Sequence, residues 1–398
     1  MNTVSSSAQS ARPEMSPTLV GLFSVSAGAI VANIYYAQPI IELIAPAVRL
    51  SSQGASLIVS LTQIGYALGL FFLVPLADLL ENRRLLIVTA LTATASLLAA
   101  AFSATPGIFL LTSLLVGLSS VTVQILIPLA AHLAPEESRG RVVGNIMSGL
   151  LLGILLARPL SSFLAQHFGW RAVFMFAAAM TLGTVGVIAT TLPRRVPEHT
   201  SSYGQLLGSL WHLFTRFAVL RERALYQGLL FGTFSLFWTS VPLELTRHYG
   251  LTQEQVGLFA LVGALGAAAA PVAGRLADAG YTRGASLFAM IVAAVSLLPG
   301  LIGGAHGVVW LGVTGIALDF AVQMNMVLGQ RAVYALDATS RGRLNALYMT
   351  SIFVGGAMGS AVASTLYSAM GWAGIVLGGS GLVLATVAAF LVHQRKRG

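Results

Sequence analysis

The side chains most able to do chemistry are a few ionisable groups inside long apolar runs of the sequence. Asp319 lies about halfway along the apolar run 306–335, and Arg158 lies within the run 141–166. A charged group in a hydrocarbon environment costs roughly 2.5–3.5 kcal/mol or more, so such groups usually face an aqueous cavity and mark a functional site. A carboxylate in such a cavity can change its protonation near neutral pH, which makes Asp319 the first candidate for a proton or cation site. The alternative is a buried acid that a structural partner holds in place.

Three roles fit Arg158. It could bind an anionic substrate, act as the counter-ion of an acid, or stabilise a helix bend beside Pro159. Arg331 lies near the end of its apolar run and is expected to extend its charge to the membrane surface. Glu42 and Glu244 lie near the outer ends of their runs, where they could form a periplasmic gate or simply be hydrated.

A further set of polar and aromatic side chains inside the apolar runs could contact a solute. Amides offer both donors and acceptors, and aromatic rings suit an amphipathic or aromatic solute. The alternatives are hydrogen bonding between helices for the amides and packing for the aromatic rings. The candidates are Tyr35, Tyr36, Gln38, Gln124, Phe234, Trp238, Gln323 and Asn325.

No sequence motif indicates an enzyme, a metal site or a cofactor. The absence of cysteine excludes disulfides, thiol catalysis and thiolate metal sites. The phosphate-binding pattern G-x-x-x-x-G-K-[ST] is missing, and the seven histidines have no metal-ligand spacing. The net charge of +9 could indicate nucleic acid, but the positions of the basic residues favour a membrane protein.

The composition predicts an all-α polytopic membrane protein. Of the 398 residues 56% are hydrophobic and 9% charged, whereas soluble domains average about 25% charged residues. A membrane-spanning helix needs about 20 mostly apolar residues, and only helices satisfy their backbone in lipid at this length. Twelve runs qualify: 18–45, 55–79, 84–103, 107–134, 141–166, 170–192, 224–246, 253–277, 284–302, 306–335, 343–368 and 371–393.

The basic residues predict the orientation of these spans. Seventeen of the 22 lysines and arginines fall on the side that holds both termini, and three fall on the other side. Basic loops stay in the cytoplasm, so both termini are expected there. The expected organisation is a disordered tail 1–16, a six-helix bundle 17–192, a linker 193–223 with an amphipathic surface helix, a second six-helix bundle 224–393 and a basic tail 394–398.

An internal repeat of about 200 residues supports two related halves. Leu76-Ala77-Asp78 recurs at 276–278, and the sequence SRGR at 138–141 recurs at 340–343. The pairs Gly169-Trp170 and Val123-Gln124 also recur, as does Glu42, each at the same place relative to the spans. Parallel repeats of this kind place a substrate site near the bilayer midplane, between the two halves.

With these features, the sequence resembles the major facilitator superfamily over essentially its whole length. The loop between the second and third spans of that family reads roughly G-x-L-A-D-R-x-G-R-R, and residues 74–84 here read VPLADLLENRR, which keeps the acid and the basic pair. A carboxylate at a helix end beside arginines forms charge-assisted hydrogen bonds. We expect a cytoplasmic latch that holds the outward-open state, although solvated loop charges worth under about 1 kcal/mol would be the alternative. The latch residues are Asp78, Arg83, Arg84 and Asp278.

Within that superfamily, NIYYAQP at 33–39 looks like bacterial drug and metabolite efflux carriers of about 400 residues. Arg158-Pro159 stands where the fifth span of proton antiporters has Gly-Pro, and the fourth span lacks the arginine that many antiporters carry near Gly117. The resemblance implies a monomer in the bacterial inner membrane that moves a small molecule by rocking its halves.

The leading hypothesis is proton-coupled export of drugs or small metabolites. A proton-coupled importer of a small, anionic nutrient bound by Arg158 is the second. A membrane sensor or scaffold without transport is the third, and the lack of a sizeable domain outside the membrane argues against it.

Overall fold

The computed structural model describes residues 16–197, 202–266 and 268–395, and these residues form helices and loops without a strand. The predicted tail 1–16 lies outside the described residues except for Ser16, and the predicted basic tail lies outside them from residue 396. The first half contains α1 (Pro17–Ala32), α2 (Ile41–Ala47), α3 (Leu57–Leu68), α4 (Asn82–Phe102), α5 (Pro106–Ser119), α6 (Thr122–Leu133), α7 (Arg139–Phe168) and α8 (Trp170–Thr191). After α9 (Tyr203–Arg216), the second half contains α10 (Ala218–Arg247), α11 (Gln253–Phe259), α12 (Gly263–Gly266), α13 (Ala269–Asp278), α14 (Thr282–Ser296), α15 (Gly307–Tyr334) and α16 (Arg341–Arg395). Short helical turns η1 (Gln38–Ile40), η2 (Gly69–Leu73), η3 (Val74–Asp78), η4 (Ala260–Val262), η5 (Pro299–Leu301), η6 (Gly304–His306) and η7 (Ala338–Ser340) extend or connect these helices.

Ten helical segments in the described residues are long and apolar enough to cross a membrane. The last of them, Ala338–Arg395, is 58 residues long and contains Gly371 with φ 60° and ψ −149°, so the chain turns there between two helices. The first apolar helix, Pro17–Ala32, has only 16 residues and depends on η1 and α2 for the rest of its path. The architecture is therefore the expected all-α membrane fold, while the total of twelve crossings stays a prediction.

The expected first span, 18–45, is not one continuous helix. Regular helix ends at Ala32, residues 33–37 form turns, and the helix resumes after η1. Pro39 has no backbone N–H and its ring restricts the preceding residue, which disfavours an uninterrupted helix here. The irregular stretch is buried, and Asn33 Nδ2 anchors it to Thr181 Oγ1 at 3.1 Å.

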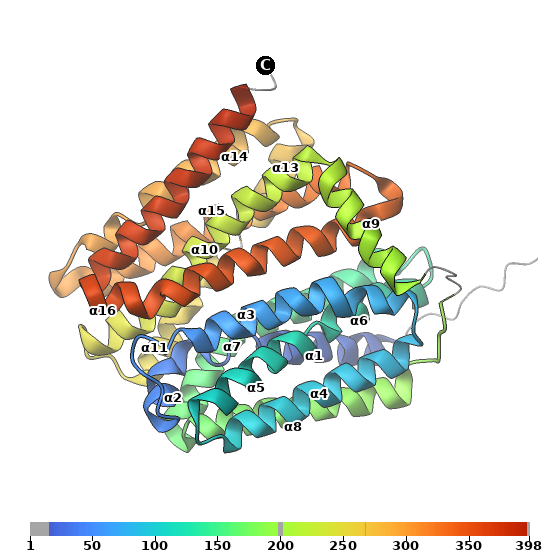
Figure 1. Ribbon diagram of the computed structural model, residues 1–398, viewed down its shortest axis with the longest axis horizontal. Helices are drawn as coiled ribbons and strands as arrows, with labels where there is room; N and C mark the ends of the chain where they lie inside the picture. The colour runs from blue at the N-terminus through green and yellow to red at the C-terminus, as the bar shows by residue number, and fades with distance from the viewer. Residues whose placement is uncertain (1–15, 198–201, 267, 396–398) are drawn as a thin grey trace, which may run out of the picture.

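The two halves form separate bundles that meet at one end of the molecule (Figure 1). The first half, blue to green, lies below the second half, yellow to red, and the halves are closest at the left, where α2 and α11 lie. Across the junction α3 packs on α16 and α7 packs on α11. We call this end of the molecule the α2 end and the opposite end the α9 end.

Close glycine contacts hold equivalent helices together in the two halves. A Cβ on Gly153 of α7 would lie 2.3 Å from the carbonyl oxygen of Gly28 on α1, and a Cβ on Gly355 of α16 would lie 2.0 Å from that of Gly228 on α10. Small residues let membrane helices approach closely, because packing rather than water exclusion drives their association. Gly153 and Gly355 are separated by 202 residues, the repeat offset seen in the sequence.

The linker does contain a helix with one apolar face. Ser202 and Gln205 form a capping box at the start of α9, and Leu206, Leu210 and Leu213 are buried while Trp211 is exposed. The seventh apolar segment starts at Ala218, six residues before the expected boundary at 224. Figure 1 shows α9 at the right-hand end of the molecule, opposite the end that holds α2.

Candidate functional site

A buried polar cluster joins the two halves of the molecule. Arg158 of α7 is 6% exposed, and its Nε donates to Gln38 Oε1 at 2.8 Å. Gln38 Nε2 in turn donates to Thr239 Oγ1 of α10 at 3.3 Å. The broken first span presents Gln38 between these helices, so a cation of the first half is connected to the second half through one amide.

Trp238 of α10 contacts both charged residues of the cluster. Its Nε1 donates to Asp319 Oδ1 of α15 at 2.8 Å, and the guanidinium carbon of Arg158 lies 4.6 Å from its ring centroid. The ring of Tyr35 lies on another side of Arg158, at 5.1 Å. Cation–π contacts are worth about 2 kcal/mol when they are desolvated. The aromatic rings therefore stabilise the guanidinium where water is scarce.

Asp319 and Arg158 do not form an ion pair. Ion pairs are formed instead by Glu42 with Arg247 and by Asp278 with Arg331. Asp319 is half-buried and packs against two glycines. A Cβ added to Gly263 would lie 2.6 Å from Oδ2 of Asp319, and a Cβ added to Gly266 would lie 2.4 Å from the Cβ of Asp319. These glycines leave the space that the carboxylate occupies.

The Nη2 atom of Arg158 is buried and has no hydrogen-bond partner among the described residues. A cavity of about 10 Å³ borders Arg158 and Trp238 on the side of α11 and the prolines Pro39 and Pro242. This volume is close to the minimum for one water molecule, so a solute cannot pass there. On this side of the cluster the buried Nη2 group of Arg158 is left without a hydrogen bond.

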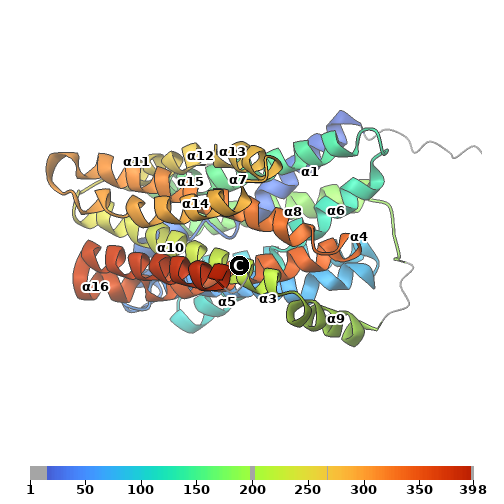
Figure 2. The ribbon, with the colours of Figure 1, turned by 90° about the horizontal axis from the view of Figure 1, so that it is seen from above.

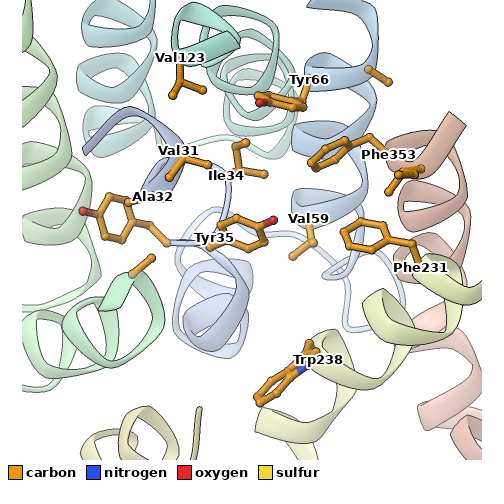
Figure 3. Packing of buried hydrophobic residues seen from close by; sticks show 14 of the residues in the cluster. Val31, Ala32, Ile34, Tyr35, Val59, Tyr66, Val123, Phe231, Trp238 and Phe353 are labelled. Carbon is orange, nitrogen blue, oxygen red and sulfur yellow. The ribbon is translucent and has the colours of Figure 1, made fainter. Parts of the chain in front are cut away.

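A row of aromatic rings continues from the cluster across the junction (Figure 3). Trp238 contacts Phe234, Phe234 stacks on Phe231, and Phe231 contacts Phe353 of α16, with ring centroids 5.0–6.3 Å apart. The ring centroid of Phe353 lies 4.5 Å from that of Tyr66, which belongs to α3 in the other half. The expectation of an aromatic surface at Phe234 and Trp238 thus extends to residues that the sequence did not single out.

An ion pair closes the α2 end across the two halves. Glu42 Oε1 of α2 lies 2.5 Å from Arg247 Nη2 of α10, and Glu42 Oε2 accepts from Thr246 Oγ1 at 2.7 Å. Glu244, the repeat partner of Glu42, is instead buried within the second half and accepts from Tyr367 Oη at 2.8 Å. The carboxylate of Glu42 therefore bonds across the halves, whereas the carboxylate of Glu244 accepts from a residue of its own half; a gate at either residue stays a prediction.

The amide candidates divide into two groups. Gln124 Nε2 donates to Tyr66 Oη at 2.9 Å, which places it next to the aromatic row. Asn325 is fully buried and donates to Gln227 Oε1 of α10 at 2.7 Å, so it joins α15 to α10 instead of facing a solute. Gln323 is half-buried and makes no hydrogen bond within the described part of the chain.

Tyr36 does not join the cluster that Tyr35 forms. Tyr36 borders a separate groove between α1, α7 and α8. Neighbouring residues of an irregular turn point in different directions, so the pair of tyrosines in the sequence does not predict a shared site.

The expected latch residues do not connect the halves in this conformation. Asp78 is exposed and makes no hydrogen bond or ion pair with the described residues. Arg83 donates to the carbonyl oxygen of Ala189 in its own half, and Arg84 is exposed. Asp278 pairs with Arg331, also within one half, so the exposed charge of Arg331, which was expected at the membrane surface, has an ion-pair partner there.

Sequence reasoning missed several residues that join the halves. Gln63 Nε2 of α3 donates to Ser235 Oγ of α10 at 2.8 Å, and Gln253 Nε2 donates to the carbonyl oxygen of Pro39 at 2.7 Å. Arg247, one of the three basic residues on the side opposite the termini, pairs with Glu42 without any signal for this in the sequence. The repeat could not reveal these contacts, because a contact between halves need not have an equivalent in the other half.

Comparisons with known proteins agree on one family. The model of the Major Facilitator Superfamily matches residues 19–226 and 223–398. The "Uncharacterized transporter YgaY" of Escherichia coli O157:H7 is 41% identical over 383 residues, which cover 94% of this chain and 95% of that protein. The "Probable sugar efflux transporter" of Pasteurella multocida is 27% identical over 138 residues, 34% of this chain and 33% of that protein. The crystal structure of the nucleoside transporter NupG superposes with a TM-score of 0.73 at 15% identity, covering 94% of this chain and 98% of that one.

Proposed function

Because the chain belongs to the major facilitator superfamily and is therefore a secondary transporter, we propose that it couples the movement of a small solute to protons through Asp319. One observation carries this proposal: Trp238 contacts both Asp319 and Arg158, and the two charges do not neutralise each other by direct contact. A carboxylate whose main partner is a neutral indole can take up a proton without breaking an ion pair.

Arg158 provides the opposing charge. When Asp319 is ionised, the guanidinium stabilises it through Trp238; when Asp319 is protonated, Arg158 is left with excess positive charge. Such a change alters how the first half, which carries Arg158, interacts with the second half, which carries Asp319. The proton is thereby linked to the rocking motion between the halves.

We propose export of drugs or small metabolites as the direction. The support is the resemblance of NIYYAQP to efflux carriers and the name of the sugar efflux relative. A bacterial inner membrane with both termini in the cytoplasm and a monomeric carrier complete the proposal. The α2 end is then periplasmic, and the conformation described is closed to the periplasm.

A second function is supported by the free donor of Arg158. The buried Nη2 has no partner among the described residues, and a carboxylate or phosphate of a solute would satisfy it. Import of a small anionic nutrient with protons is the function that this donor would serve.

The test is solute-dependent proton flux in proteoliposomes. Neutral sugars, nucleosides, uronic acids and nucleotides serve as probes for wild type, Asp319→Asn and the control Glu254→Gln, an exposed acid on α11. We expect Asp319→Asn to lose at least about 90% of the proton flux and the control to keep it. An Asp319→Asn protein with unchanged proton-driven transport would refute the coupling role. Selective loss of the anionic probes in Arg158→Ala would favour the import function.

A second readout needs no transported solute. Protonation of Asp319 changes the acceptor of the Trp238 indole, so acidification should alter tryptophan emission in wild type and not in Asp319→Asn. Trp238→Phe identifies the share of the signal that comes from this residue. Identical acid responses in wild type and Asp319→Asn would also contradict the proposal.

A further inference from the structure

A groove of about 760 Å³ lies between α1, α7 and α8, apart from the cluster that joins the halves. These three helices pack against one another, and Figure 2 shows α1 at the edge of the molecule. The groove belongs wholly to the first half and contains neither Arg158 nor Asp319. Its volume suits a ligand of several hundred daltons.

The mouth of the groove carries free hydrogen-bond donors. Arg141 and Asn145 are one helical turn apart on α7, and both are exposed. Neither side chain makes a hydrogen bond or ion pair with the described residues, since only the backbone carbonyl of Asn145 is used, by Ser24 Oγ. The neighbouring Arg139, by contrast, donates to the carbonyl oxygen of Ala131 at 3.0 Å. A guanidinium and an amide at this spacing can both bind one phosphate group.

Beyond the mouth the walls of the groove are mostly apolar, with Ser24, Ser148 and Tyr36 among them. Val25 of α1 is 60% exposed, and Leu152 and Leu156 of α7 are 55% and 50% exposed. From Arg141 to Leu152 the helix rises about 16 Å at 1.5 Å per residue. This length is close to half of the ~30 Å hydrocarbon core of a bilayer, which is the depth of one leaflet.

We propose that this groove binds one anionic phospholipid from the leaflet at the α9 end. The phosphate lies at Arg141 and Asn145, and an acyl chain lies along α1 and α7. A cation at the membrane surface above an apolar groove between helices matches the charge and the shape of such a lipid. The inference depends on the membrane fold and is independent of the proton coupling proposed above.

Native mass spectrometry of the full-length protein in detergent tests this proposal. The probes are phosphatidylglycerol, phosphatidylcholine and glycerol phosphate, each added to delipidated protein. We expect one phosphatidylglycerol to bind about tenfold more tightly than phosphatidylcholine, and Arg141→Ala with Asn145→Ala to remove that preference, because about one charge-assisted hydrogen bond is lost. The control Arg283→Ala removes an exposed charge outside the groove and should leave the preference unchanged.

A second variant tests the acyl part of the site. Gly21 lines the groove, and a Cβ there would have no atom within 4 Å, so the side chain of Gly21→Leu has room to start into the groove. We expect this variant to lose the bound phosphatidylglycerol while Arg141 stays intact. Equal binding of both lipids, displacement of the lipid by glycerol phosphate alone, or full retention in both groove variants would each overturn the proposal.

Discussion

The ion pair between Glu42 and Arg247 should shift the balance between the two transport conformations when it is broken. It joins α2 of the first half to α10 of the second half at the α2 end. Opening this end must separate the two residues, so the pair stabilises only the conformation in which the end is closed. Glu42→Gln and Arg247→Gln each remove one charge and keep much of the side-chain shape.

The size of the effect follows from exposure and geometry. The side chains of Arg247 and Glu42 are 50% and 25% exposed, respectively. Partly exposed ion pairs are worth about 0.5–1 kcal/mol in double-mutant cycles. At 1.4 kcal/mol per factor of ten, each single variant should raise the ratio of open to closed protein at this end about two- to fivefold.

Spin-label distance measurements can follow this ratio directly. The chain has no cysteine, so cysteines introduced at the exposed positions Gln166 of α7 and Glu254 of α11 are labelled without background. The double variant Glu42→Gln with Arg247→Gln should populate the conformation that is open at the α2 end no more than either single variant does. The charge swap Glu42→Arg with Arg247→Glu should restore the wild-type ratio of open to closed protein. If the double variant shows the sum of the two single effects, the pair does not stabilise closure and the reasoning is refuted.

Two further predictions concern the candidate proton site at Asp319 and the loop between α15 and α16. Gly263→Ala should lower proton-coupled transport several-fold, because its methyl group would lie 2.6 Å from Asp319 Oδ2 and force that side chain to move; proton flux in proteoliposomes measures the loss. Asp337 lies between α15 and α16, and hydrogen bonds from Thr339 lower the pKa of its carboxyl to about 2. Since the pKa of an unfolded aspartate is about 3.9, the stabilisation by Asp337 should be complete above pH 5 and disappear as the pH falls through 4 toward 2. Thermal denaturation of wild type and Asp337→Asn across this pH range measures it.

Each of these predictions has a control. Gly183→Ala places a methyl group where a Cβ has no atom within 4 Å, so it should transport like wild type; equal losses in Gly183→Ala and Gly263→Ala would show that the effect is not local to Asp319. For Asp337, the difference in melting temperature between wild type and Asp337→Asn should be constant from pH 5 to pH 8. A difference that already vanishes at pH 6 would contradict the role of the Thr339 hydrogen bonds.

The fold could be predicted because its main determinants act along the chain. A membrane helix satisfies its own backbone hydrogen bonds, so apolar length alone locates it, and the repeat pairs place equivalent segments in each half. The breaks were harder to predict. Pro39 signals the interruption of the first segment, but the turns at residues 33–37 depend on buried contacts such as that of Asn33 with Thr181.

Individual site residues could be nominated in sequence but not assembled. Asp319 and Arg158 stood out because a charge in an apolar run is costly, and nothing in the chain indicated that Trp238 contacts both. Asn325 carries the same chemistry as Gln124, yet it faces α10 whereas Gln124 lies beside the aromatic row. The side that a helix turns toward its neighbours depends on how all the helices pack.

The sequence by itself determined the membrane class, the two-fold repeat and the short set of polar residues that lipid would not tolerate. These properties follow from the free energy of moving residues into hydrocarbon, which adds up along the chain. Only the tertiary structure decided which of those residues meet: Arg158 with Gln38 and Trp238, Glu42 with Arg247, and Asp278 with Arg331. Such pairings depend on the crossing of helices that lie far apart in the sequence, and hydropathy contains no information about that geometry.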